Sequence, residues 1–167
     1  MIYLDNSATT RPSEAVAAAV RQLLEGGWYN PSALYKPALE VQKKLEAVRE
    51  SCLKAAGAGG GRVVFTSGGT EADNLAILGY MRTARIPGRV LMLQTEHPAV
   101  SACEAELLRI GHQTEMLPVN REGVADLAKL ETMLDDRVRL ICVMQVNNEV
   151  GAAQPVAEIA ALRNRHP

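Results

Sequence analysis

Short apolar runs alternate with amphipathic stretches over most of this chain. The runs are rich in β-branched and aliphatic residues, a composition typical of buried strands, and they cover residues 63–66, 90–93, 114–119 and 138–146. Between and after them, apolar residues recur at helical spacing over residues 70–83, 98–110, 126–134 and 155–165. Strands and helices in regular alternation, joined by short connections, predict βαβ units whose parallel sheet is covered by helices on both faces.

The residues that precede these units have a helical pattern. It covers residues 12–24 and 33–56, and a glycine-rich turn follows each stretch. We therefore expect an N-terminal helical segment over residues 1–61 and βαβ units over residues 62–167. On length alone, 167 residues are enough to bury a core and are typical of one domain.

Composition narrows the classes of partner. Charged residues make up 22% of the chain and the formal net charge is −1, which does not favour binding to nucleic acid or to a membrane surface. Aromatic residues are only 4%, too few for a surface that stacks bases. The chain starts without the basic and apolar regions of a signal peptide, and it has no apolar run of the roughly 18 residues that a membrane span needs. Three scattered cysteines, Cys52, Cys103 and Cys142, fit reduced thiols in the cytoplasm better than a disulfide framework or a metal site.

The turn after the first apolar run is a candidate anion site. Ser67, Gly68 and Gly69 break the run, and a helical pattern begins at Thr70. The first N–H groups of a helix lack partners within the helix and lie at the positive end of its dipole, so such a turn favours phosphate. Glycine lets the backbone approach closely, and the Ser67 and Thr70 hydroxyls can donate hydrogen bonds. The alternative is an ordinary turn with a capping box formed by Thr70 and Asp73.

Ligands of parallel α/β sheets gather beyond the carboxyl ends of the strands. In this chain the residues able to do chemistry follow strands, at positions 67–70, 95–97 and 147–149. Each has a simpler explanation when taken alone: His97 could cap a helix, and Asn147 and Asn148 could be turn formers. Their coincidence on one edge of the sheet favours a binding site.

Five motifs along the chain carry a resemblance to a known family. They are Tyr-Leu-Asp-Asn-Ser-Ala-Thr-Thr at residues 3–10, Asn-Pro-Ser at 30–32, Phe-Thr-Ser-Gly-Gly-Thr-Glu-Ala-Asp-Asn at 65–74, Thr-Glu-His at 95–97 and Val-Asn-Asn-Glu-Val-Gly at 146–151. In this order they resemble the motifs of the cysteine desulfurases, which are pyridoxal 5'-phosphate (PLP) enzymes of the class V aminotransferase group. The resemblance runs over essentially the whole chain.

The resemblance implies a fold and a set of site residues. The fold would be the large domain of a PLP-dependent transferase (aspartate aminotransferase-like, fold type I), present here as an incomplete parallel-type sheet flanked by helices. Gly69 and Thr70 would hold the PLP phosphate. His97 would stack on the pyridine ring and act as a catalytic residue in proton transfer, and Asn148 would contact the phenolic oxygen of the ring.

The resemblance also implies an activity. L-cysteine would be converted to L-alanine, with sulfur transferred to an enzyme persulfide for the synthesis of iron–sulfur clusters or thio-cofactors. The implied partners are L-cysteine, a sulfur-acceptor or scaffold protein and, in the full-length form, a second copy in a homodimer. The implied location is cytoplasmic, and neither nucleic acid, a membrane nor a metal is expected.

The chain departs from the family pattern in two ways. Tyr29 and Tyr35 stand where the family usually has Gly before, and often His after, the Asn-Pro-Ser loop. Members of the family are also longer, and their later segments bring an Asp for the pyridine nitrogen, the lysine that binds PLP covalently and a mobile cysteine that takes the sulfur. No lysine here stands in such a motif or follows Lys129, and no cysteine matches the mobile one. We therefore interpret residues 1–167 as the N-terminal part of the large domain, inactive by itself, with the C-terminal part absent.

Two other interpretations stay open at this point. The chain could belong to another class V PLP enzyme, an aminotransferase or a lyase, which the cysteine loop would distinguish. It could also be a truncated, non-catalytic binding partner.

Overall fold

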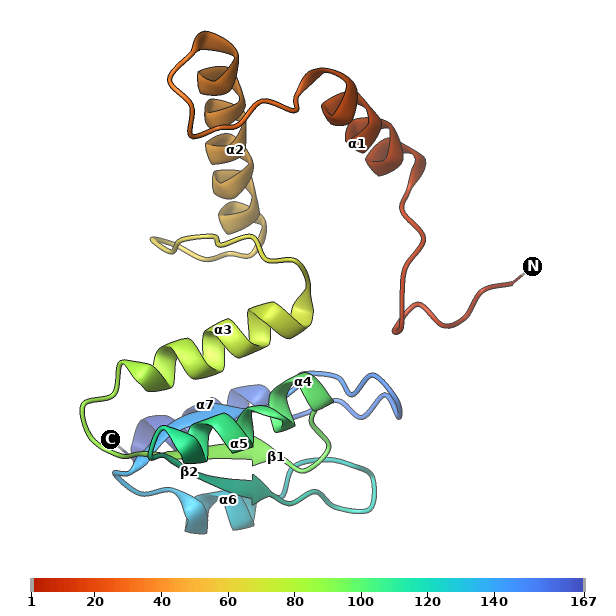
Figure 1. Ribbon diagram of the computed structural model, residues 1–167. Helices are drawn as coiled ribbons and strands as arrows, with labels where there is room; N and C mark the ends of the chain where they lie inside the picture. The colour runs from red at the N-terminus through yellow and green to blue at the C-terminus, as the bar shows by residue number, and fades with distance from the viewer. Residues whose placement is uncertain (1, 167) are drawn as a thin grey trace. The chain divides into compact units, whose positions relative to one another are not determined.

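The computed structural model describes residues 2–166. The chain divides into two compact units, one that ends at Phe65 and one that begins at Thr66. In the first unit, helix α1 (Glu14–Gly26) begins after Ser13, whose hydroxyl caps it by accepting a hydrogen bond from the Val16 amide at 3.3 Å. Among the described residues, no helix is both long and apolar enough to cross a membrane. The described part of the first unit contains two helices, as the helical pattern predicted: α1 (Glu14–Gly26) and α2 (Lys36–Ala55) (Figure 1).

The described part of the second unit is built on three parallel strands in the order β2–β1–β3. Figure 1 shows β1 and β2 side by side. The parallel pairing confirms the predicted α/β class. The helix predicted over residues 98–110 is present as two shorter helices that meet at Ala102. In chain order the elements are α3 (Gly69–Arg82), β1 (Arg89–Leu93), α4 (Pro98–Ser101), α5 (Cys103–Arg109), β2 (Gln113–Leu117), α6 (Leu127–Met133), β3 (Val138–Cys142) and α7 (Val156–Arg165).

The prediction of a buried strand over residues 63–66 is wrong. These residues belong to no strand in the structure, and Val64 and Phe65 are 59% and 49% exposed. The guanidinium of Arg49 lies 5.6 Å from the centre of the Phe65 ring instead. A β-branched composition suits a sheet, but a strand forms only where a neighbour offers backbone hydrogen bonds, and none of the described residues pairs with this segment. The second unit therefore has three strands in its described part rather than four.

The last strand is shorter than predicted. The apolar run continues to Val146, but β3 ends at Cys142. The Met144 amide donates a hydrogen bond to the Glu96 carboxylate, from the loop after β1, instead of to a neighbouring strand. Val146 then forms an antiparallel bridge with Ala153, so the end of the run belongs to a small hairpin.

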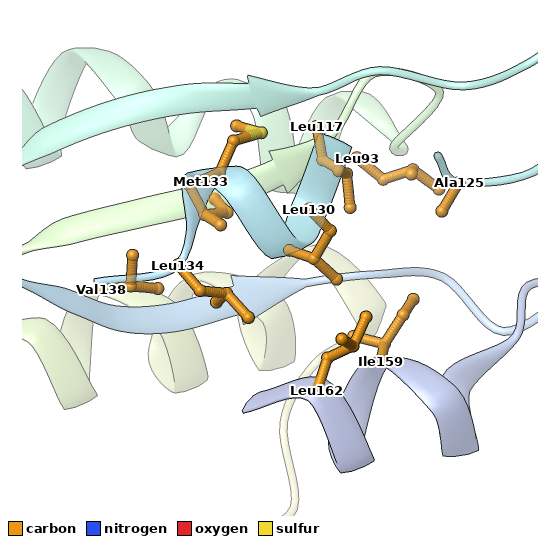
Figure 2. Close-up of a cluster of buried hydrophobic side chains, with 10 residues drawn as sticks. Leu93, Leu117, Ala125, Leu130, Met133, Leu134, Val138, Ile159 and Leu162 are labelled. Carbon is orange, nitrogen blue, oxygen red and sulfur yellow. The ribbon is translucent and has the colours of Figure 1, made fainter. Parts of the chain in front are cut away.

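The two faces of β1 contribute to two halves of one core. Val90 and Met92 pack in a cluster with α3, α4 and α5, whereas Leu91 and Leu93 pack in a cluster with α6 and α7. All four side chains are 2% exposed or less. Figure 2 shows the second cluster, in which Leu130 of α6 lies among side chains of the sheet and of α7. Because successive strand residues face opposite sides, a strand covered on both faces is apolar throughout, as the sequence pattern indicated.

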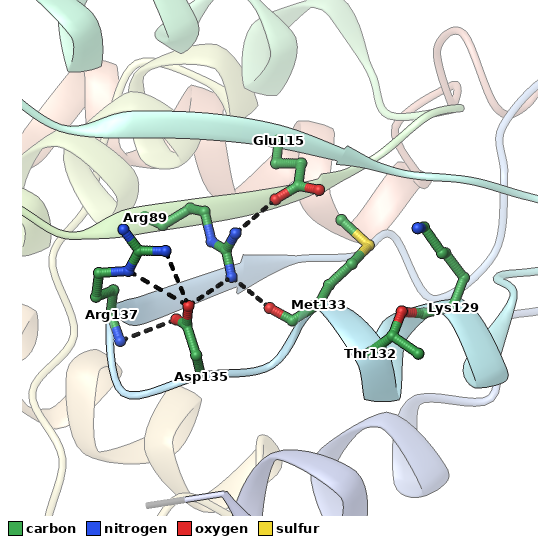
Figure 3. A network of polar contacts seen from close by, with 7 residues as sticks. All are labelled: Arg89, Glu115, Lys129, Thr132, Met133, Asp135 and Arg137. Atoms are coloured by element: carbon green, nitrogen blue, oxygen red, sulfur yellow. Dashed lines mark hydrogen bonds and ion pairs between the residues drawn. The ribbon is translucent and has the colours of Figure 1, made fainter.

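Arg89 joins three segments at the amino end of the strands (Figure 3). Its guanidinium forms ion pairs with Glu115 of β2 at 2.8 Å and with Asp135, in the turn before β3, at 3.2 Å. It also donates to the carbonyl of Met133. Burial of Asp135 favours its neutral form, but hydrogen bonds from Arg137 and the charges of both arginines outweigh this and lower the pKa of the carboxyl. These contacts stabilise the end of the sheet opposite the predicted site.

His112 is a buried polar link at the same amino end. His112 is 6% exposed, and its Nδ1 accepts a hydrogen bond from the Gly88 amide at 3.1 Å. The proton of the neutral ring is therefore on Nε2, which donates to the Met81 carbonyl at 2.9 Å. The histidine, which precedes β2, thus satisfies one backbone group of α3 and one of the turn before β1, and its role is structural.

Candidate functional site

The start of α3 lies beside the residues that follow β1. The Asn74 side chain donates to the Thr70 carbonyl at 2.8 Å and to the Ala99 carbonyl of α4 at 3.2 Å. Ala99 is two residues from His97, which follows β1 in the chain. One asparagine therefore links the turn that opens α3 to the loop at the carboxyl end of β1.

The loops after β1 and β3 are also joined to each other. Asn147, which is 8% exposed, donates from its side chain to the Thr95 carbonyl at 3.0 Å. The Met144 amide donates to the Glu96 carboxylate, as described above. Through these links the structure brings the four predicted site residues to one edge of the second unit: Gly69, Thr70, His97 and Asn148.

The first turn of α3 has free donors and open space. Its cap is Gly68, which has no side chain to bond the first amides of the helix. Within the described residues, no partner accepts a hydrogen bond from the Gly69 or Thr70 amide. A Cβ built at either glycine would meet no other heavy atom within 4 Å, so the space beside the turn is open. Free N–H groups at the positive end of a 14-residue helix suit an anion.

A carboxylate within the turn changes two sequence-based expectations. Glu71 accepts hydrogen bonds from the Ser67 hydroxyl at 2.6 Å and from the Ser67 amide at 2.7 Å. These bonds, the hydroxyl first, lower the pKa of Glu71. The capping box predicted as an alternative, formed by Thr70 and Asp73, is therefore wrong, because Glu71 closes the turn. The Ser67 hydroxyl already donates to Glu71, so only the Thr70 hydroxyl stays available as a side-chain donor to phosphate.

His97 is a helix cap with an exposed ring. Its Nδ1 accepts a hydrogen bond from the Ala99 amide at 3.0 Å, which places the proton of the neutral ring on Nε2. The side chain is exposed at the carboxyl edge of the sheet. The simpler explanation, a capping histidine, is thus correct for Nδ1, and the ring face and Nε2 remain free to contact a ligand.

The two neighbouring asparagines have opposite environments. The Asn147 side-chain oxygen accepts hydrogen bonds from the Glu149 and Val150 amides, each at 2.9 Å, so this residue is the turn former. Asn148 is exposed, and its side chain has no hydrogen-bond partner among the described residues. Of the two amides, only that of Asn148 is available to a ligand.

A groove of about 270 Å³ adjoins His97 and is lined by Asp73, Glu96 and Cys142, among others. Burial, followed by the negative charge of Glu96, raises the pKa of the Cys142 thiol to about 12. Burial, followed by the charge of Asp73, also raises the pKa of Cys103. Because the thiolate is the nucleophile, neither buried cysteine is activated to take up sulfur.

Sequence reasoning did not predict the long-range hydrogen bonds by which three residues hold this edge together. Asn74 belongs to the quoted glycine-rich motif, and Glu96 and Asn147 belong to the two motifs that follow it, but their polar partners lie 25 to 52 residues away in the chain. The motifs indicated the positions of these residues, whereas their hydrogen-bond partners could be identified only in the folded chain.

Comparisons with known proteins agree with the fold and the motifs. The family model described as Aminotransferase class-V matches residues 2–166. A NifS/IcsS protein homolog of Lactobacillus delbrueckii subsp. bulgaricus is 36% identical over 168 residues, which are 100% of this chain and 44% of that protein. Cysteine desulfurase IscS 1 of Archaeoglobus fulgidus is 34% identical over 165 residues, which are 98% of this chain and 43% of that protein.

Solved structures are similar over the same extent. A NifS-like protein matches with a TM-score of 0.91 and 29% identity, covering 98% of this chain and 45% of that one. DndA from Streptomyces lividans matches with a TM-score of 0.79 and 30% identity, covering 99% of this chain and 47% of that one. The chain therefore spans less than half the length of these relatives. Members of the matched family use PLP, and this α/β chain belongs to the class V aminotransferase family.

Proposed function

We propose that this chain supplies the phosphate- and ring-binding part of a PLP-dependent cysteine desulfurase. The observation that carries the proposal is that four residues lie at one edge of the sheet, where hydrogen bonds join the loops: Gly69, Thr70, His97 and Asn148. The names of the relatives supply the activity, since several are cysteine desulfurases. In this proposal residues 1–167 are the N-terminal part of the PLP-binding large domain.

The residues at the start of α3 fit a phosphate group. The Gly69 and Thr70 amides are free, the helix dipole favours negative charge, and open space lies beside both glycines. The Thr70 hydroxyl adds one donor. These groups would hold the phosphate of PLP and thereby fix its position at the carboxyl edge of the sheet.

The side chains of His97 and Asn148 fit two different contacts with the pyridine ring of PLP. The exposed imidazole of His97 would stack on the pyridine ring, with Nε2 free to give or take a proton. The free amide of Asn148 would donate to the phenolic oxygen of the ring. When bound, PLP withdraws electrons from the α-carbon of an amino-acid substrate, and the protein groups supply position and electrostatics.

The proposed reaction of the complete enzyme converts L-cysteine to L-alanine and leaves the sulfur as a persulfide on an enzyme cysteine. The proposed use of that sulfur is the synthesis of iron–sulfur clusters or thio-cofactors, through an acceptor or scaffold protein. A homodimer of the full-length form and a cytoplasmic location are part of the same proposal.

Replacement of Thr70 by Val tests the phosphate site. The 167-residue chain should bind PLP non-covalently, and T70V should weaken binding about tenfold, because a hydrogen bond from a hydroxyl to a charged oxygen is lost at constant side-chain volume. Equilibrium dialysis against PLP measures the affinity. Thr132, an exposed threonine of α6 whose hydroxyl donates to the Lys129 carbonyl, provides the control, and T132V should leave the affinity unchanged. Equal affinity of T70V and the unsubstituted chain would contradict the proposal.

Replacement of Glu71 by Gln should have the opposite effect. The amide oxygen of Gln can still accept from the Ser67 amide, but the negative charge at the start of α3 is removed. We expect the affinity for inorganic phosphate to rise about two- to fivefold near pH 7, because the carboxylate of Glu71 is ionised there and repels the anion; the Ser67 hydrogen bonds, which lower its pKa, keep it ionised to lower pH as well.

Isothermal titration with inorganic phosphate gives the measurement for E71Q. The control is E104Q, because Glu104 of α5 also accepts a hydrogen bond from a hydroxyl, that of Thr114 at 2.6 Å. E104Q should not alter phosphate affinity. Weaker phosphate binding by E71Q would show that the carboxylate supports the site instead of opposing the anion.

A further inference from the structure

The hairpin after β3 is organised around the side chain of Asn147. Its oxygen accepts from the Glu149 and Val150 amides, and its own amide nitrogen donates to the Thr95 carbonyl at 3.0 Å. Its backbone bonds across the hairpin as well, with the amide donating to the Ala152 carbonyl at 2.9 Å. At 8% exposure, this side chain is the buried centre of the loop.

The same side chain is a direct link between two loops that carry proposed ligand contacts. Thr95 is two residues before His97, and Asn147 is the residue before Asn148. Within the described residues, the Asn148 side chain makes no hydrogen bond, and the His97 side chain makes only the one that Nδ1 accepts from the Ala99 amide. The spacing between His97 and Asn148 therefore depends on how their two loops are held together, and the Asn147–Thr95 bond joins these loops beside the bond between Met144 and Glu96.

We propose that Asn147 is a positioning residue: its side-chain amide holds the loop that presents Asn148 against the loop that presents His97. This inference rests on the proposed function, because that function makes His97 and Asn148 the groups that contact the cofactor ring. The bond that the proposal depends on is the one that the side-chain NH2 group of Asn147 donates to the Thr95 carbonyl. The side-chain oxygen only closes a turn, which the oxygens of many asparagines do.

Replacement of Asn147 by Asp tests the donated bond separately from the two accepted ones. The carboxylate keeps the shape and both acceptor bonds, but it presents an oxygen to the Thr95 carbonyl and so loses the Asn147–Thr95 bond, while the bond between Met144 and Glu96 in the same two loops remains. We expect PLP affinity of the 167-residue chain to fall about fivefold, similar to the loss in N148A, which removes the contact itself. N147S is a second variant, since a serine hydroxyl can close the turn but is too short to reach Thr95.

The matched control is Asn120 in the loop after β2. Its side-chain oxygen also accepts from two amides, those of Glu122 at 3.0 Å and Val124 at 2.9 Å, and the side chain is exposed. N120D introduces the same charge into the same kind of turn. It should leave PLP affinity and the His97 signals unchanged.

A readout without ligand distinguishes positioning from general stability and from the proposed function. In NMR spectra of the ligand-free chain, the His97 ring and Asn148 side-chain signals should shift in N147D and N147S but not in N120D. The amide of Val150 should stay protected from hydrogen exchange in N147D, because its acceptor is retained. If the unsubstituted chain fails to bind PLP, the proposed function is refuted but the positioning role of Asn147 is not, because the NMR shifts test that role without ligand. Unchanged His97 and Asn148 signals in both Asn147 variants would overturn the inference.

Discussion

The 167-residue chain, supplied with PLP and L-cysteine, is expected to release no alanine above the rate of free PLP in solution. Two requirements of the reaction are unmet by its side chains. Lys129, the lysine of the second unit, is exposed on α6, and the other lysines, Lys36, Lys43, Lys44 and Lys54, lie on α2 in the first unit, none within a motif of the family. The buried thiols of Cys103 and Cys142 have raised pKa values, so they are poor nucleophiles toward sulfur. The exposed cysteine, Cys52, lies on α2 and stands in no motif of the family.

Alanine released over time, measured by mass spectrometry at several protein concentrations, provides the test. T70V is the control, because any activity of the proposed site must fall with the affinity for PLP. Alanine production that rises in proportion to the protein and is lost in T70V would show that the chain is catalytically competent, contrary to this expectation.

Replacement of Leu130 by Ala is expected to lower the free energy of unfolding of the second unit by about 2–5 kcal/mol. Leu130 is fully buried at the centre of the cluster in Figure 2, between the sheet and α7. The truncated side chain leaves a cavity whose walls, from separate elements, cannot all move inward. The loss should appear in hydrogen exchange of the β1 amides, which report the opening of this unit.

The control for the core variant is Leu108 on α5, whose side chain is 53% exposed. L108A should change the free energy of unfolding by about 0.5 kcal/mol or less. Equal effects of L130A and L108A would mean that the cluster around Leu130 contributes little to the stability of the unit.

Local pattern was sufficient where the determinants of structure are near in sequence. Helix α3 and strand β1 appear where periodicity and glycine breaks predicted them, because their hydrogen bonds and apolar faces follow from a few neighbouring residues. The run over residues 63–66 has an equally suitable composition, yet it is not a strand. A strand depends on a partner that its own residues cannot specify.

Competition between local and distant partners explains the remaining errors. The apolar run that forms β3 stops pairing at Cys142, and beyond it the Met144 amide donates to the carboxylate of Glu96, 48 residues earlier in the chain, which local pattern does not predict. At the start of α3, the sequence allowed a capping box of Thr70 and Asp73, but the helix begins after Gly68 without a side-chain cap, and Glu71 accepts a hydrogen bond from the Ser67 amide instead. The ion pairs of Arg89 likewise connect residues from separate strands and turns.

The sequence by itself determined the α/β class, the family and the positions at which residues able to do chemistry follow the strands. Asn147 and Asn148 are identical neighbours in one motif, and the resemblance alone pointed to Asn148 as the ligand contact, while both stayed candidate turn formers. The tertiary structure decided which of them forms the turn, because it places the Thr95 carbonyl, 52 residues away in the chain, at 3.0 Å from the side-chain amide of Asn147 and leaves Asn148 exposed. A buried amide must find partners, whereas an exposed one is free to bind a ligand.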